Sequence, residues 1–297
     1  MGLDLFLQHL TNGISLGSLY ALIAIGYTMV YGILRLINFA HGDILMMATY
    51  FAFYSMAIFA LPWYLSFILA ILLTALLGIF IEKAAYKPLR NAPKISIMIS
   101  AIGVSFFLEN LATVVFSGVP KKFPEPKFFT EVIHIGNVSL QRLTIVIPLA
   151  TLVILFMLLY LVNKTKNGMA MRAVSKDYET ASIMGVDVNK TISFTFGIGS
   201  VLAAVGAIMW GMKFPQIQPL MGVMPGLKCF IAAVIGGIGN ITGAVIGGFI
   251  LGIGEIMLVA FLPTLSGYRD AFAFILLILI LLFKPTGIMG ENISEKV

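Results

Sequence analysis

Cysteine and histidine are scarce in this sequence. Among its 297 residues stand one cysteine, Cys229, and three histidines, no two of which have metal-ligand spacing. One cysteine excludes an intramolecular disulfide and a cysteine-based metal cluster. We therefore expect no metal site and no soluble metalloenzyme chemistry.

Charged residues are also few, at 11% of the chain, whereas 60% of the residues are hydrophobic. The mean hydropathy of +1.02 lies far outside the usage of soluble globular proteins. A net charge of +6 could suggest nucleic acid, but the cations occupy short loops between apolar runs. That pattern is typical of topology determinants and lipid-headgroup contacts. We expect an all-α integral membrane protein that binds no nucleic acid.

Long apolar runs predict about eight transmembrane helices in a single polytopic domain, residues 1–297. The run at 194–212 is rich in small residues, which let helix backbones approach closely, so we expect it inside the bundle. Residues 226–262 are too long for one span, and glycines at 236–243 predict a broken or re-entrant pair. The other predicted spans cover residues 10–31, 37–61, 65–81, 95–116, 143–162 and 271–283.

The basic loops predict the orientation. Placing residues 83–94, residues 164–190 and Lys284 in the cytoplasm satisfies the positive-inside rule. The N-terminus then faces out, the C-terminus faces in, and the loop at 119–142, with a hairpin at Gly136 and Asn137 as one alternative, lies outside. Residues 226–262 must then enter and leave on one side, as a re-entrant hairpin or as two short crossings. The first residues lack an early Lys or Arg and a small-residue cleavage site, so we expect no removable signal peptide.

The longest polar interruption besides that loop is the segment 164–193, which has five cations and three anions. Within it, residues 171–184 predict a short amphipathic helix that ends before Gly185, with a turn at Asp187 and Asn189. One interpretation is a connector on the membrane surface, and the other is a helix that docks a soluble partner. The apolar face would consist of Met171, Val174, Tyr178, Ala181 and Met184.

A short motif favours docking. Glu179, Thr180 and Ala181, followed by Gly185 after three residues, resemble the Glu-Ala-Ala-x-x-x-Gly loop by which ABC-importer permeases contact their ATPase subunits. Thr180 replaces the central alanine, and the hydrophobic-Leu-Pro ending of that motif is absent.

Polar residues within the spans offer further candidate sites. Asn38, His41 and Asp43 could start a helix at the interface, capped by Asp43, or form a broken helix beside a translocation path. The residues Gly236, Gly237, Gly239 and Asn240 favour close helix packing, with a bend or gate on the path as the second choice. No soluble strand precedes them, so a nucleotide-binding loop is excluded. Glu109 and Glu255 stand alone in spans, where proton relays or buried hydrogen bonds could explain them.

Ordered motifs carry a wider resemblance. The run from Tyr27 to Asp43, YTMVYGILRLINFAHGD, looks like the hallmark of branched-chain amino-acid ABC-importer permeases of the LivH type. The resemblance covers about residues 13–290, with Lys284 where arginine is usual and Thr242-Gly243 where Pro-Gly is common. Five more motifs match in order: residues 184–187, 225–228, 236–239, 268–270 and 282–287.

This resemblance implies a transport subunit of the prokaryotic inner membrane without enzymatic chemistry, catalytic residues or cofactors of its own. ATP would be bound by two cytoplasmic ATPases, and a second, M-type permease and a periplasmic or lipid-anchored binding protein would complete the assembly. The substrate would be Leu, Ile or Val. The helix at 172–186 would couple ATPase closure to transport through Arg172, Asp177, Glu179, Ala181, Met184, Gly185 and Val186.

Three alternatives stay open. A permease of the same superfamily could carry urea or short amides. A secondary transporter would couple uptake to an ion gradient through Asp43, Glu109 or Glu255. An intramembrane enzyme would need a nucleophile, and His41 near Asp43 has none placed beside it.

Overall fold

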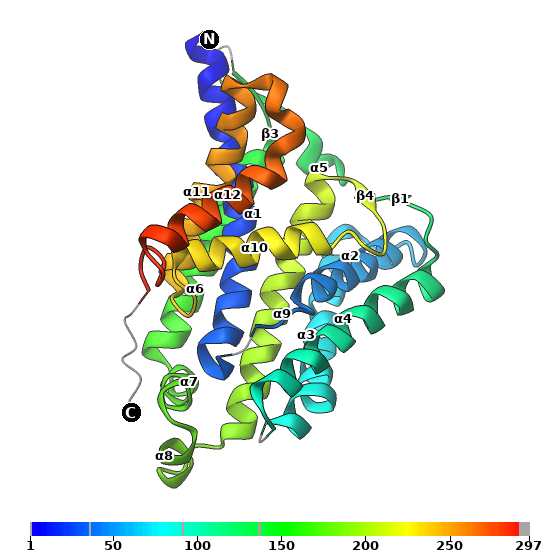
Figure 1. The fold of residues 1–297 in the computed structure, drawn as a ribbon. Coiled ribbons are helices and arrows are strands. Elements are labelled where there is room, and N and C mark those ends of the chain that lie inside the picture. Colours follow the sequence, from blue (N-terminus) through cyan, green and yellow to red (C-terminus); the bar gives the residue numbers. More distant parts are fainter. Residues whose placement is uncertain (1, 36, 91, 136–137, 291–297) are drawn as a thin grey trace.

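The computed structural model describes residues 2–35, 37–90, 92–135 and 138–290 as a bundle of helices with two small antiparallel sheets (Figure 1). The helices are α1 (Leu3–Leu34), α2 (His41–Ala57), α3 (Trp63–Ile81), α4 (Lys94–Phe116), α5 (Lys127–Thr130), α6 (Arg142–Lys164), α7 (Lys166–Lys176), α8 (Tyr178–Ile183), α9 (Val188–Lys213), α10 (Val223–Gly236), α11 (Ile241–Phe261) and α12 (Arg269–Phe283). Shorter turns cover Glu82–Tyr86 (η1), Lys87–Leu89 (η2) and Pro263–Tyr268 (η3).

The prediction of an all-helical membrane protein is confirmed. Seven helical segments among the described residues are long and apolar enough to cross a membrane. The predicted span at 37–61 is shorter than expected, because α2 begins at His41 and ends at Ala57. Its 17 residues cover about 25 Å, less than the roughly 30 Å of a bilayer core.

Helix α1 lies at the centre of the bundle (Figure 1). In its most apolar 18-residue window, 94% of the residues are buried, against 17% for α4 and for α6. Helix α9, which covers the predicted small-residue span, follows with 67%. The expectation that this span lies inside the bundle is therefore confirmed.

Helices α1 and α11 pack backbone to backbone. A Cβ atom placed on Gly252 of α11 would lie 2.2 Å from the Gly17 nitrogen of α1. Farther along α1, Gly32 lies against Gly239, which precedes α11. Rising residue numbers on α1 thus meet falling numbers on α11, and the two helices are antiparallel.

The long apolar stretch at 226–262 forms a pair of unequal helices. Helix α10 has 14 residues, about 21 Å, and α11 has 21 residues, about 31 Å. They are joined by a bend at residues 237–240. The pair therefore combines one short helix with one of spanning length, which corrects the alternative of two short crossings.

Strands occur in the predicted loop at 119–142 and in the loop after α9. Strand β2 (Val132–Ile135) pairs antiparallel with β3 (Val138–Gln141), with Val132 opposite Gln141. The hairpin turn predicted at Gly136 and Asn137 lies outside the described residues. Strand β1 (Lys121–Lys122) pairs with β4 (Gln216–Ile217), which ties this loop to the segment before α10.

The α1–α11 contact predicts a stability difference between two glycines. Gly252→Val should lower the free energy of unfolding by more than the about 1–3 kcal/mol of ordinary overpacking, because the added atoms meet backbone rather than side chains. Gly103→Val is the matched control, since nothing lies within 4 Å of a Cβ atom there. Denaturant titration in detergent micelles measures both, and equal stability of the two variants would contradict the packing described here.

Candidate functional site

The polar segment 164–193 forms two short helices rather than one. Asp177 is extended (φ −158°, ψ 118°) between α7 and α8. Its carboxylate accepts hydrogen bonds from the Glu179 N–H at 2.9 Å and the Thr180 hydroxyl at 2.7 Å. The predicted single helix over 171–184 is therefore wrong, because Asp177 breaks it and caps the N-terminus of α8.

The end of α8 follows the prediction. Gly185 has φ +84°, and its N–H donates to the Ser182 carbonyl oxygen at 3.0 Å, while the Val186 N–H donates to that of Ala181. These two bonds form a Schellman motif, in which glycine adopts the left-handed conformation without a Cβ penalty. Asp187 then caps α9, and the Lys190 N–H that donates to its carboxylate at 3.0 Å lowers the pKa of that carboxyl.

The predicted apolar face divides into an anchored part and an exposed tip. Met171, Val174 and Ala181 are buried against the protein. By contrast, Ile183 is 84% exposed and Met184 is 79% exposed. We call these two residues and Gly185 the α8 tip; helix α8 projects away from the bundle (Figure 1).

Two polar contacts tie this segment to the end of α1. The Tyr178 hydroxyl donates to the Ile33 carbonyl oxygen at 2.5 Å. The Arg35 guanidinium donates to the Ser175 carbonyl oxygen at 3.4 Å. Partial burial of Tyr178 raises the pKa of its phenol.

A second tie joins the start of α9 to the turns after α3. The carboxylate of Glu82 is fully buried, forms an ion pair with Arg90 and accepts from the Ser193 hydroxyl at 2.5 Å. Arg90 also donates to the Asn189 side-chain oxygen at 2.7 Å. The segment 164–193 is thus attached to the bundle near its middle, at Ser175 and Tyr178, and at its C-terminal end, at Asn189 and Ser193.

Asn38, His41 and Asp43 are all buried. Asn38 accepts from the Tyr86 hydroxyl at 2.8 Å, and the His41 ring lies edge-on to Tyr27 at 5.0 Å between centroids. The predicted capping role of Asp43 is wrong, because Ala40 occupies the N-cap and Asp43 accepts from the Ser105 hydroxyl of α4 at 2.5 Å. Asn38 Nδ2 and His41 Nε2 have no hydrogen-bond partner among the described residues.

The N-termini of the two short helices, α2 and α10, meet. A Cβ atom on Gly222, just before α10, would lie 2.0 Å from the Gly42 carbonyl oxygen in α2. The glycines at 236–239 lie at the opposite end of α10. The structure therefore places the two predicted groups of path residues at different ends of one helix, not in one site.

The close packing predicted for the glycine-rich bend is confirmed. A Cβ atom on Gly236 would lie 1.9 Å from the Gly243 carbonyl oxygen, and one on Gly237 would lie 2.4 Å from the Gly290 nitrogen. Asn240 caps α11 through the Gly243 N–H at 2.9 Å and donates to the Met289 carbonyl oxygen at 3.0 Å. The bend is thus sealed by the segment that follows α12.

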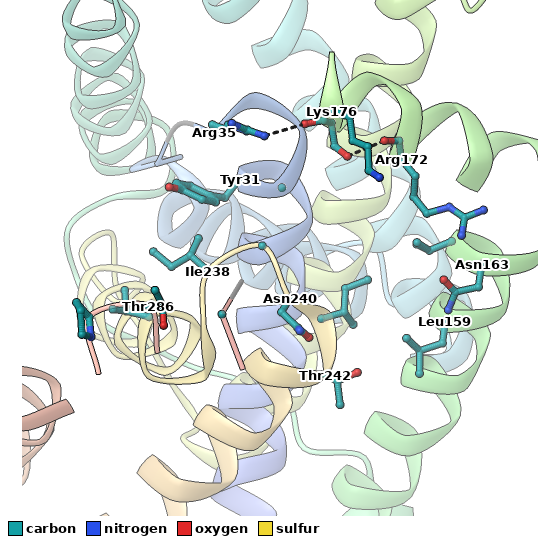
Figure 2. A pocket seen from close by; sticks show the side chains of 18 residues that line it. Tyr31, Arg35, Leu159, Asn163, Arg172, Lys176, Ile238, Asn240, Thr242 and Thr286 are labelled. Carbon is teal, nitrogen blue, oxygen red and sulfur yellow. Dashed lines mark hydrogen bonds between the residues drawn. The ribbon is translucent and has the colours of Figure 1, made fainter. Parts of the chain in front are cut away.

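A cavity of about 860 Å³ lies between the end of α1, the end of α6, α7 and this bend. Arg35, Arg172 and Lys176 lie along one side of it, and Asn240 and Thr242 at the start of α11 lie across from them (Figure 2). Arg172, predicted as a coupling residue, therefore lines this cavity. Its predicted partners Met184 and Gly185 belong to the α8 tip.

A buried ion pair was not predicted from the sequence. Lys228 of α10 lies 3.0 Å from the Glu255 carboxylate of α11 and 2.8 Å from Asp270 of α12. The Tyr20 hydroxyl of α1 donates to Glu255 at 3.1 Å. Glu255 is therefore not a lone acid. The sequence feature that could have indicated this pair is Lys228, the single lysine within the apolar stretch 226–262.

Comparison with known families decides the class. Residues 9–281 match the family described as the permease component of the branched-chain amino acid transport system. The chain belongs to this permease family. The resemblance predicted from the ordered motifs is confirmed.

Individual relatives support the same family assignment. The permease chain is 41% identical to the high-affinity branched-chain amino acid transport system permease protein BraD of Pseudomonas aeruginosa and equally to LivH of Escherichia coli K12, over 98% of each chain. A probable branched-chain amino acid permease, LivH of Methanocaldococcus jannaschii, is 30% identical over 95% of this chain and 92% of its own. Among solved structures, PsaBC from Streptococcus pneumoniae in complex with Fab shares the fold, with a TM-score of 0.50 at 15% identity and coverage of 94% and 92%.

The buried ion pair of this permease predicts a compensated double variant. Lys228→Met should cost about 3–5 kcal/mol of unfolding free energy, because it leaves the Glu255 carboxylate buried without its cation. Adding Glu255→Leu should recover much of that loss. Denaturant titration tests this, with Lys83→Met, an exposed lysine, as the control. Additive losses in the double variant would show that the pair does not act as a unit.

Proposed function

We propose that this permease is the membrane subunit of an ATP-driven importer for Leu, Ile and Val, and that its α8 tip contacts a cytoplasmic ATPase subunit. The observation that carries the proposal is the exposure of Ile183 and Met184. Exposed apolar side chains on the membrane-spanning helices face lipid, but this tip belongs to a polar segment between two spans. Adjacent apolar side chains on such a polar segment suit contact with another protein.

The attachments of the segment support a coupling role. A force on α8 reaches the end of α1 through Tyr178 and Ile33, and it reaches the turns after α3 through Ser193 and Glu82. From there Tyr86 contacts Asn38, in the break before α2. ATPase closure would thus act on the α1–α2 break and on the junction of α2 with α10.

Charge supports the orientation. The ends of α1 and α6, helix α7 and residues 285–290 line one cavity, so they share one end of the bundle. Three cations of that cavity and nearby Lys284 make this end the cytoplasmic one by the positive-inside rule. The N-terminus then faces out, the C-terminus faces in, and the 119–142 loop faces the periplasm.

The named relatives suggest the substrate class, and the resemblance suggests the partners. The assembly would contain an M-type permease, two ATPases that bind the ATP and a binding protein that delivers the amino acid. We propose that parting of the α2 and α10 N-termini opens the path, since backbone N–H groups at helix N-termini suit a carboxylate. Asn38 and His41, whose side chains hold unpartnered polar atoms within the described structure, would then face the zwitterion.

The docking proposal predicts that charge on the α8 tip uncouples the transporter. Met184→Asp should reduce leucine uptake at least about tenfold, because an anchor residue at an interface contributes on the order of 2 kcal/mol. Uptake and ATP hydrolysis are measured in proteoliposomes that hold the full assembly. Met169→Asp is the matched control, an exposed methionine on α7.

Two results would count against the proposal. Full uptake by Met184→Asp would contradict docking at the tip. Uptake that follows an ion gradient without ATP would contradict the importer class and return attention to Asp43 and Glu109.

A further inference from the structure

We propose that the cavity bounded by α1, α6, α7 and the α10–α11 bend binds the phosphate group of an anionic phospholipid. Arg35, Arg172 and Lys176 supply three positive charges to its wall. Among the described residues that line it there is no aspartate or glutamate. A basic pocket between membrane helices suits an anionic headgroup.

The opposite wall adds a second source of positive potential. Helix α11 begins at Ile241, and both Ile241 and Thr242 line the cavity. Asn240 accepts the Gly243 N–H, so the N–H groups of Ile241 and Thr242, together with the helix dipole, are the part of this N-terminus that would favour a bound anion. Figure 2 shows this end of α11 facing the side that carries Arg35 and Lys176. A phosphate between the two walls would meet donors from both.

The rest of the lining suits a lipid rather than a small free anion. Leu159, Val162, Val234 and Ile238 form an apolar part of the wall. The cavity lies where α1 and α6 end, and at the end of a spanning helix a lipid headgroup would meet its acyl chains. Basic residues near the polar group and aliphatic residues beside the chains match the two parts of a phospholipid.

Charge also distinguishes this ligand from a transported amino acid. A zwitterion would bring an ammonium group to a wall whose described residues include three cations and no carboxylate, and these cations would repel the ammonium group. A phosphodiester headgroup such as phosphatidylglycerol brings a net negative charge. Lipid binding at this cavity would not depend on which amino acid is transported.

Native mass spectrometry of the full chain, titrated with dioleoylphosphatidylglycerol, tests the site. The double variant Arg172→Gln/Lys176→Gln should bind this lipid about thirtyfold more weakly than wild type, because each basic residue near an anionic headgroup contributes roughly fivefold. The control is Lys164→Gln/Lys166→Gln, which removes the same charge from the same segment outside the cavity. All four side chains are exposed, so both variants should fold. Circular dichroism checks this.

The arms of the experiment separate the sources of phosphate. The proposal requires that phosphatidylglycerol bind wild type and control alike and that dioleoylphosphatidylcholine bind weakly to all three. Equal retention of phosphatidylglycerol by both double variants would overturn the site. Displacement of that lipid by millimolar inorganic phosphate would overturn the lipid assignment in favour of a free anion. If a variant loses the lipid but still transports, the importer proposal is unaffected. Failure of the lipid site and failure of the importer proposal can therefore be told apart.

Discussion

Backbone groups inside a bilayer must find hydrogen-bond partners within the protein, because no water is available there. The bend between α10 and α11 shows how this constraint is met. The last carbonyl oxygens of α10, on Ile235 and Gly236, accept the N–H groups of Ile288 and Met289 at 2.9 Å each. Glycines at the contact let these segments approach, so residues 287–290, which follow α12, seal the bend. The hydrogen bonds of the α10–α11 bend therefore depend on residues distant in sequence.

The same reasoning links the polar segment 164–193 to transport. A docking tip transmits force when its base is fixed, and this base is fixed at the end of α1 and at the turns after α3. Glu82 is central to the second attachment, because its buried charge is balanced by Arg90 and by the Ser193 hydroxyl. The tip itself keeps two apolar side chains in water. A coupling element is expected to be attached to the transmembrane bundle and to expose apolar side chains to its partner, and α8 has both properties.

Much of the fold was predictable because a long apolar run by itself favours a membrane-spanning helix. Most of the predicted runs became helices near their predicted bounds, although α1 begins at Leu3, well before residue 10, and the run at 226–262 became two helices. The permease class was predictable from six ordered motifs. The break at Asp177 was missed because Val174, Tyr178 and Ala181 keep helical spacing across it, and spacing alone does not weigh an N-cap against continuation. The pairing of Lys228 with Glu255 joins residues on different helices, which periodicity cannot register. The cavity was equally inaccessible, since its three cations come from segments far apart in the chain.

The central claim is that the α8 tip faces the cytoplasm and contacts the ATPase subunit. The one cysteine, Cys229, is fully buried, so an introduced thiol can be followed almost without background. The most direct measurement is cross-linking of an Ile183→Cys variant within the membrane-embedded assembly by a short bifunctional thiol reagent. The account predicts a covalent product with the ATPase subunit, and none from Val114→Cys, an exposed position on α4. Labelling of Ile183→Cys by an impermeant reagent from the outer face, without cross-linking, would contradict it.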